Sequence, residues 1–188
     1  MRVALTALAL AALTATPANA LADDSPEKPA HERMLVADLG MHVVGFGYQH
    51  MASRFVAGQL VLAYYQPWTQ NIDLLGLSGE ANKGGDLRGM IARARVFFHP
   101  FGDAPTGFWI SPFAQAGVGW GRRNGEREAG AISAAGLSLG YSTMLSKAIL
   151  LGGGFGLQVH SAQIPGGNDP PSFSRFYPQV EIQLGYVF

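Results

Sequence analysis

From Phe176 to Phe188 every second residue of this 188-residue chain is apolar, and the residues between them are mostly polar or small. A period of two residues is that of a β-strand whose two faces meet different surroundings. The same alternation recurs in segments 130–144 and 148–163, and no stretch after residue 30 shows sustained helical periodicity. The chain is therefore predicted to be all-β.

The second face of these strands distinguishes between two kinds of barrel. It carries Gly, Ser, Gln and a few isolated charges, as at Gly152, Gly154 and Gln158. A soluble barrel points its apolar side chains inward and many Lys and Glu outward, whereas a transmembrane barrel has an apolar exterior and a polar or small interior. Charged residues make up 14% of the chain, well below the roughly 25% of soluble domains. The pattern favours a transmembrane barrel.

The alternation predicts eight strands, an even number, as a closed single-chain barrel with both ends on one side requires. They are expected at 32–39, 41–50, 54–65, 88–99, 107–120, 130–144, 148–163 and 176–188. Apart from the short junction at Gly40, which should be external, the connections alternate in length, which is typical of short periplasmic turns and long external loops. The long polar ones are 66–87, 121–129 and 164–175. Asp38 interrupts the first strand; if that strand is absent, segment 72–77 must supply another. The predicted fold is an eight-stranded antiparallel up-and-down transmembrane β-barrel.

The first 22 residues read as a secretory signal peptide. Arg2 precedes an apolar run, and small residues allow cleavage after Ala20 or Ala22. The run is shorter than the roughly 20 residues that a membrane helix needs. Segment 23–30 is polar with two prolines and is predicted to be a flexible lead-in, so the barrel spans 31–188. Export through this signal agrees with a location in the bacterial outer membrane.

Composition excludes several functional classes. The chain has no Cys, which removes disulfides, thiolate metal sites and cysteine nucleophiles. Lys and Arg number 13 and Asp and Glu also 13, so no charge excess indicates nucleic acid as a partner.

The C-terminal strand also carries a family resemblance. Its apolar row Ile182, Leu184, Tyr186 and Phe188 ends in an aromatic residue and resembles the assembly signal of bacterial outer-membrane barrels. With the signal peptide and the eight strands, the chain is similar to small barrels typified by the membrane domain of outer membrane protein A. Segments 45–48, 87–89, 97–100 and 107–109 further resemble an uncharacterised family of such barrels. The resemblance implies an outer-membrane location, with lipid and the barrel-insertion machinery as partners, and it implies no active site.

Strand alternation predicts a polar network inside the barrel. In segment 88–99 it points Arg93 and Arg95 inward, and in the last strand it points Glu181 inward. These strands are fourth and eighth of eight, so they lie across the lumen from one another, and buried charges there must be paired. Gln158, His160 and Gln183, together with Gln179, are expected to extend the network. The network either fills the lumen or forms a gated proton or ion path.

The sequence predicts no catalytic, cofactor-binding or metal-binding residues, and hence no enzyme. Lipid A deacylases with this fold use a His and a Ser two residues apart, whereas here the neighbours His160 and Ser161 point to opposite faces of a strand. A lipid-modifying enzyme and a soluble periplasmic ligand-binding barrel remain the alternatives to a structural or surface-interaction protein.

The external loops are the predicted place of any specific interaction. Arg122, Arg123 and Arg127 in loop 121–129 are interleaved with acidic residues. Basic residues near the outer leaflet suit the phosphates of lipopolysaccharide. No other surface ligand is predicted.

Overall fold

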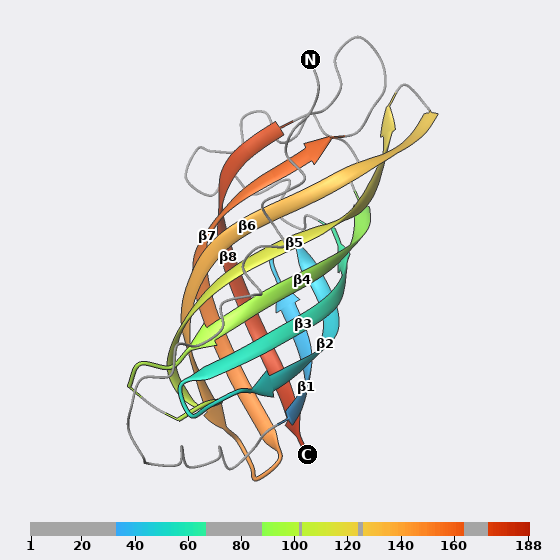
Figure 1. Cartoon of the computed structure of the whole chain (residues 1–188). Coiled ribbons are helices and arrows are strands. Elements are labelled where there is room, and N and C mark those ends of the chain that lie inside the picture. Colours follow the sequence, from blue (N-terminus) through green and yellow to red (C-terminus); the bar gives the residue numbers. More distant parts are fainter. Residues whose placement is uncertain (1–32, 67–87, 102, 124–125, 164–172) are drawn as a thin grey trace.

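Eight strands close into one antiparallel barrel in a computed structural model that describes residues 33–66, 88–101, 103–123, 126–163 and 173–188 (Figure 1). They are β1 (Arg33–Gly40), β2 (Val43–Met51), β3 (Val56–Tyr65), β4 (Arg88–Phe98), β5 (Gly107–Arg123), β6 (Glu126–Met144), β7 (Ile149–Gln163) and β8 (Phe173–Val187). Each strand pairs with the next, and β8 pairs with β1 along the closing seam. The predicted fold class is confirmed. Because β1 is a strand, closure needs none from 72–77, which lies outside the described residues, as does the predicted signal peptide.

The predicted loop 121–129 is wrong for most of its length. β5 and β6 remain paired as far as Arg123 and Glu126, so they form a hairpin that rises beyond the other strands (Figure 1). Likewise β8 begins at Phe173, inside the predicted loop 164–175. Strand pairing continues past the apolar pattern because cross-strand backbone hydrogen bonds do not require apolar side chains.

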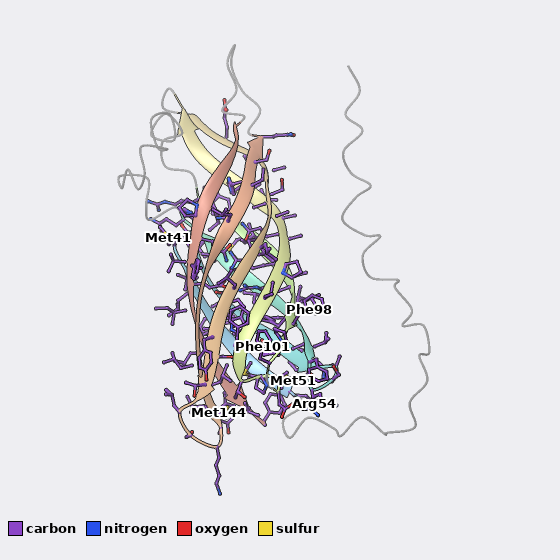
Figure 2. All side chains as sticks on the ribbon, turned by 90° about the vertical axis from the view of Figure 1, so that its left-hand side faces the viewer. Met41, Met51, Arg54, Phe98, Phe101 and Met144 are labelled. Atoms are coloured by element: carbon purple, nitrogen blue, oxygen red, sulfur yellow. The ribbon has the colours of Figure 1, made fainter. Side chains whose placement is uncertain are left out.

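The β2–β3 and β6–β7 turns, the β4–β5 connection and the C-terminus lie at one end of the barrel, and the β1–β2 turn lies at the other (Figure 1). Met51, Arg54 and Met144 mark this lower end, whereas Met41, in the β1–β2 turn, lies well above them (Figure 2). The end with short turns is the periplasmic end in barrels of this type.

Large apolar side chains cover the outside of the barrel. They include Leu35, Leu39, Phe46, Leu60, Leu62, Met90, Val96, Phe98, Val118, Leu137, Phe155, Leu157, Val180, Ile182 and Leu184. Along the 11 residues of β4, a rise of about 3.3 Å per residue and a tilt of about 40° give an apolar band roughly 25 Å high. This arrangement is that of a transmembrane barrel and the reverse of a soluble ligand-binding one. Antiparallel single-chain barrels of this type are those of bacterial outer membranes, and the predicted location follows from this surface.

Among the described residues, none belongs to a helix long and apolar enough to cross a membrane.

The segment between β4 and β5 folds across the lower end of the barrel. The backbone N–H of Ala104 donates to the carbonyl of Arg54 at 2.7 Å, and Arg54 also pairs with Asp103 at 2.9 Å. The N–H of His99 donates to the carbonyl of Phe55. Burial lowers the pKa of the His99 imidazole below its usual range. Ala104 itself joins the lower apolar cluster inside the barrel.

Candidate functional site

The interior of the barrel is layered along β4. Its inward residues run from the upper to the lower end as Ile91, Arg93, Arg95 and Phe97, and all four are buried. Ile91 belongs to an upper apolar cluster that also contains Val43, Val61, Ala63, Tyr65 and Ile132. Phe97 belongs to a lower cluster that also contains Met34, Val36, Met51, Ala57, Ala104, Trp109, Leu150 and Val187. The two arginines therefore lie in a charged layer between two apolar ones.

Arg95 is held by Glu181 through two hydrogen bonds. Its Nη1 and Nη2 donate to the two carboxylate oxygens of Glu181, each at 2.6 Å. Nε donates to Ser111 Oγ at 3.2 Å, and Nη2 also donates to Ser138 Oγ at 2.7 Å. Gln179 donates to Glu181 Oε2 at 2.8 Å. A bidentate pair supported by further hydrogen bonds to both partners is the geometry in which a buried ion pair is well compensated.

Arg93 links a second carboxylate to the same layer. Its Nη1 donates to Asp38 Oδ2 at 2.9 Å, and its Nε donates to Gln115 Oε1 at 2.8 Å. The same Nη1 lies 3.9 Å from Glu181 Oε2. Asp38, Arg93, Arg95 and Glu181, called here the charged layer, thus form a continuous chain of two cations and two anions. Their formal charges cancel.

Aromatic rings enclose the guanidinium groups. The Cζ of Arg95 lies 4.9 Å from the ring centroid of Phe97, 5.8 Å from that of Trp109 and 5.6 Å from that of Phe113. The Cζ of Arg93 lies 5.3 Å from the Phe113 centroid. Cation–π contacts between buried groups stabilise a cation by about 2 kcal/mol each. The arginines are therefore both paired and packed.

Glycines on β6 and β7, the two strands that follow β5 around the barrel, make room for these rings. A Cβ atom added at Gly140 or Gly154 would collide with the indole of Trp109, and one added at Gly136 would collide with the ring of Phe113. The glycine-rich stretch of β7 thus has a packing role, since a glycine inside a strand commonly marks a close approach.

The other residues of the predicted network also line the interior. Gln158, His160 and Gln183 are all buried. Gln183 is the register partner of Asp38 and so adjoins the charged layer. His160 lies with the upper cluster, where its ring stacks on that of Tyr65 at a centroid distance of 5.2 Å. The structure thus brings Arg93, Arg95 and Glu181 into contact and places His160 in a different layer.

Asp38 is the member of the charged layer that sequence reasoning missed. The sequence pattern indicates a break in the first strand at Asp38, whereas the residue occupies an inward position in line with Met34 and Val36 and is fully buried. The outward positions Leu35 and Leu39 keep their apolar alternation around it. The sequence did contain a signal for this role. Asp38 is an acidic residue at an inward position, and the barrel is predicted to have two inward arginines that need partners.

The predicted assembly-signal residues all lie on the outside of β8. Ile182, Leu184, Tyr186 and Phe188 are exposed, whereas Glu181 is buried. Their row therefore forms part of the apolar band beside the seam with β1.

The arrangement of His160 and Ser161 does not form a catalytic pair. His160 points inward and is buried, while Ser161 lies at an outward position. The carboxylate of Glu181 is occupied by Arg95. Among the described residues, the carboxylates and guanidinium groups of the charged layer neutralise one another.

Comparison with known proteins gives structural neighbours only. No protein-family model matches the chain, and no curated protein matches it. The crystal structure of the N-terminal β-barrel domain of Pseudomonas aeruginosa OprF is 12% identical, with a TM-score of 0.45 over 86% of this chain and 98% of that one. The solution structure of the E. coli outer membrane protein W is 16% identical, with a TM-score of 0.41 over 86% of this chain and 100% of that one.

Proposed function

We propose that the protein is a non-enzymatic outer-membrane barrel with a lumen plugged by side chains, which acts structurally or through its external segments. The observation that carries this proposal is the charged layer, in which Arg93 and Arg95 are paired, packed against aromatic rings and closed off above and below by apolar clusters.

The physical argument concerns the cross-section of the barrel. Eight strands enclose an interior just wide enough for side chains to fill. Here the guanidinium of Arg95 lies inside the barrel, 5.8 Å from the ring centroid of Trp109 and 5.6 Å from that of Phe113. Water or ions would have to pass the two apolar clusters as well as the paired charges, and this supports a closed lumen over an ion path.

Planar-bilayer recordings test the plugged lumen. The purified wild-type chain, shown to be folded by its altered mobility on unheated gels, is expected to give no steady conductance. Replacing the Arg95–Glu181 pair by two alanines removes volume without leaving a lone charge, so this variant should conduct more. The matched control, R95M/E181L, keeps most of the volume and should stay closed. A large steady conductance of the folded wild type would contradict the proposal.

The proposed surface interaction is assigned to the external segments 66–87 and 164–175. They lie outside the described residues, apart from Gln66 and the start of β8. The absence of enzymatic activity is tested by mass analysis of lipid A from cells that express the protein. The masses of lipid A should match those from the same cells without this protein. A new lipid A species that disappears when His160 or Glu181 is replaced would show that the protein is an enzyme.

A further inference from the structure

Side chains at the edge of the charged layer each keep one buried polar atom that has no partner among the described residues. Gln115 accepts a hydrogen bond from Arg93 through Oε1, but its Nε2 has no acceptor. Gln179 donates to Glu181 through Nε2, but its Oε1 has no donor. Asp38 accepts from Arg93 through Oδ2, whereas its Oδ1 has no donor. The charged layer therefore has hydrogen-bonding capacity that the protein itself does not fill.

The partners of the two amides fix which atom is left over. The Nε of Arg93 can only donate, so the atom of Gln115 that faces it is the oxygen. The ionised carboxylate of Glu181 can only accept, so the atom of Gln179 that faces it is the nitrogen. Turning either amide over would bring two donors or two acceptors together. The leftover atoms are therefore one N–H donor, on Gln115, and two acceptor oxygens, on Gln179 and Asp38.

These atoms belong to groups that surround one guanidinium. Gln115 and Asp38 both contact Arg93, at 2.8 Å and 2.9 Å. The Nη1 that binds Asp38 lies 3.9 Å from Glu181 Oε2, and this oxygen accepts from Gln179 at 2.8 Å. The leftover donor and acceptors thus gather in one layer of the lumen.

Gln183 adds a second donor beside Asp38. The two residues are register partners across the seam between β1 and β8, and directly opposed residues have Cβ atoms about 5 Å apart. The Nε2 of Gln183 is buried and, within the part of the chain that the structure describes, has no acceptor. The side chains therefore adjoin without bonding to each other, which leaves a donor and an acceptor for one small molecule to bridge.

The mixture of donors and acceptors selects the ligand. Gln59 and Gln158 each leave a further buried oxygen, Oε1, without a described partner. A cation would suit all these oxygens, but it would face two guanidinium groups and the N–H of Gln115. An anion would face the two carboxylates of the layer. Water both donates and accepts, and a buried water typically makes about three hydrogen bonds to polar groups that otherwise lack partners.

We propose that the charged layer binds individual water molecules, which bridge Asp38 to Gln183 and complete the hydrogen bonding of Gln115 and Gln179. The inference rests on the proposed function, because a lumen open to solvent would hold no water distinct from the bulk. The two ion pairs are direct, at 2.6 Å and 2.9 Å, so the waters lie beside them and do not screen them. The plug then consists of side chains and bound water together, enclosed by the two apolar clusters.

Magnetisation transfer from water tests the bound molecules in the folded full-length barrel. Solid-state NMR in vesicles, at short mixing times, should show transfer from water to the side-chain amides of Gln115 and Gln183. The methyl groups of Ile91 and Ile132, in the upper apolar cluster, are the internal control and should receive none. A closed barrel without transfer to either amide would overturn the proposal.

A substitution distinguishes a hydrated amide from a dry one. Q183M keeps most of the volume and removes the amide. If water bridges Gln183 to Asp38, the variant loses a hydrogen bond and its unfolding equilibrium constant in urea should rise about fivefold. If the amide is dry, its removal should stabilise the barrel, which would contradict the proposal. The matched control is Q163M, at an exposed position on β7, which should unfold like the wild type.

Crystallography tests the identity of the ligand. Crystals of the full-length barrel should show water within hydrogen-bond distance of Asp38 Oδ1 and Gln115 Nε2. A direct bond between Asp38 and Gln183, or anomalous signal at these atoms after soaking with rubidium or bromide, would reject water as the ligand. Conductance of the same preparation separates the two proposals. A closed, dry barrel would keep the plug and reject the bound water, whereas a steady conductance would reject both.

Discussion

At the scale of single residues, Gly154 and Gly153 are neighbours with opposite environments. Gly154 faces the indole of Trp109, whereas the nearest atom to a Cβ at Gly153 is the carbonyl oxygen of Glu181 at 3.8 Å. G154A is expected to destabilise the barrel by about 1–3 kcal/mol, the usual cost of overpacking, because the new Cβ would collide with the indole of Trp109 and the ring would have to shift. Urea unfolding in vesicles measures the change, and G153A should stay near the wild type. Equal midpoints for the two variants would mean that Trp109 is not tightly held.

Glu181 is the carboxylate that compensates Arg95. E181A should destabilise the barrel by roughly 3–5 kcal/mol, because one charge of a buried pair is left without its partner. The control is D103N, which breaks the exposed Arg54–Asp103 pair, whose side chains are 48% and 67% accessible, and should cost less than about 1 kcal/mol. Urea midpoints in vesicles compare the two. If E181A lost no more stability than D103N, the charged layer would be hydrated.

The inward arginines were predictable from the sequence, but their partners were only partly so. Alternation within 88–99 assigned Arg93 and Arg95 to the lumen, and the eight-strand count put Glu181 across from them. Alternation cannot say which arginine meets which carboxylate, because that depends on barrel stagger and on side-chain length. The aromatic rings around Arg95 depend on glycines two strands away, so nothing local in the sequence indicates them.

At the scale of the strand, β8 has two faces that should respond oppositely to substitution. Leu184 is 47% exposed on the outside, whereas Gln183 is buried in the lumen. L184R should cost roughly 2–4 kcal/mol, as basic residues do near the middle of the bilayer, while Q183S changes only interior hydrogen bonding. Folded yield on unheated gels and urea midpoints measure both variants. Equal tolerance would mean that the outward face of β8 does not meet lipid.

Strand positions were predicted to within a few residues, except where strands leave the membrane. The apolar alternation defined the strands from 33 to 163 because lipid on one side requires it. It stops at Trp120 on β5, and the sequence beyond, with three arginines and two glutamates, has the composition of a loop. Pairing continues there through backbone hydrogen bonds, which carry no signature in side-chain polarity.

At the scale of the whole molecule, the height of the apolar band determines which bilayer thickness the barrel matches. Its height of roughly 25 Å follows from strand length and tilt. Folding yield into vesicles of increasing acyl-chain length should therefore be highest near that hydrocarbon thickness and fall in thicker bilayers, since mismatch costs free energy for each ångström. Unheated gels measure the folded fraction. A yield that kept rising with chain length would contradict the assigned band.

The charged layer has a consequence for the timing of assembly. Arg93 and Arg95 both lie on β4, yet Asp38 lies on β1 and Glu181 on β8, the two strands that meet last at the seam. Until β1 and β8 pair, Asp38 and Glu181 cannot both reach the arginines, and an unpaired arginine keeps its hydration. We therefore expect water to leave the lumen only when the barrel closes. Stopped folding reactions run on unheated gels should show E181Q delayed in its final mobility shift but not in its first association with vesicles. An unchanged final step would mean that the ion pairs form only after β8 has paired with β1. The expected delay would mean that pairing of the lumen charges helps β8 to close the barrel in its correct position.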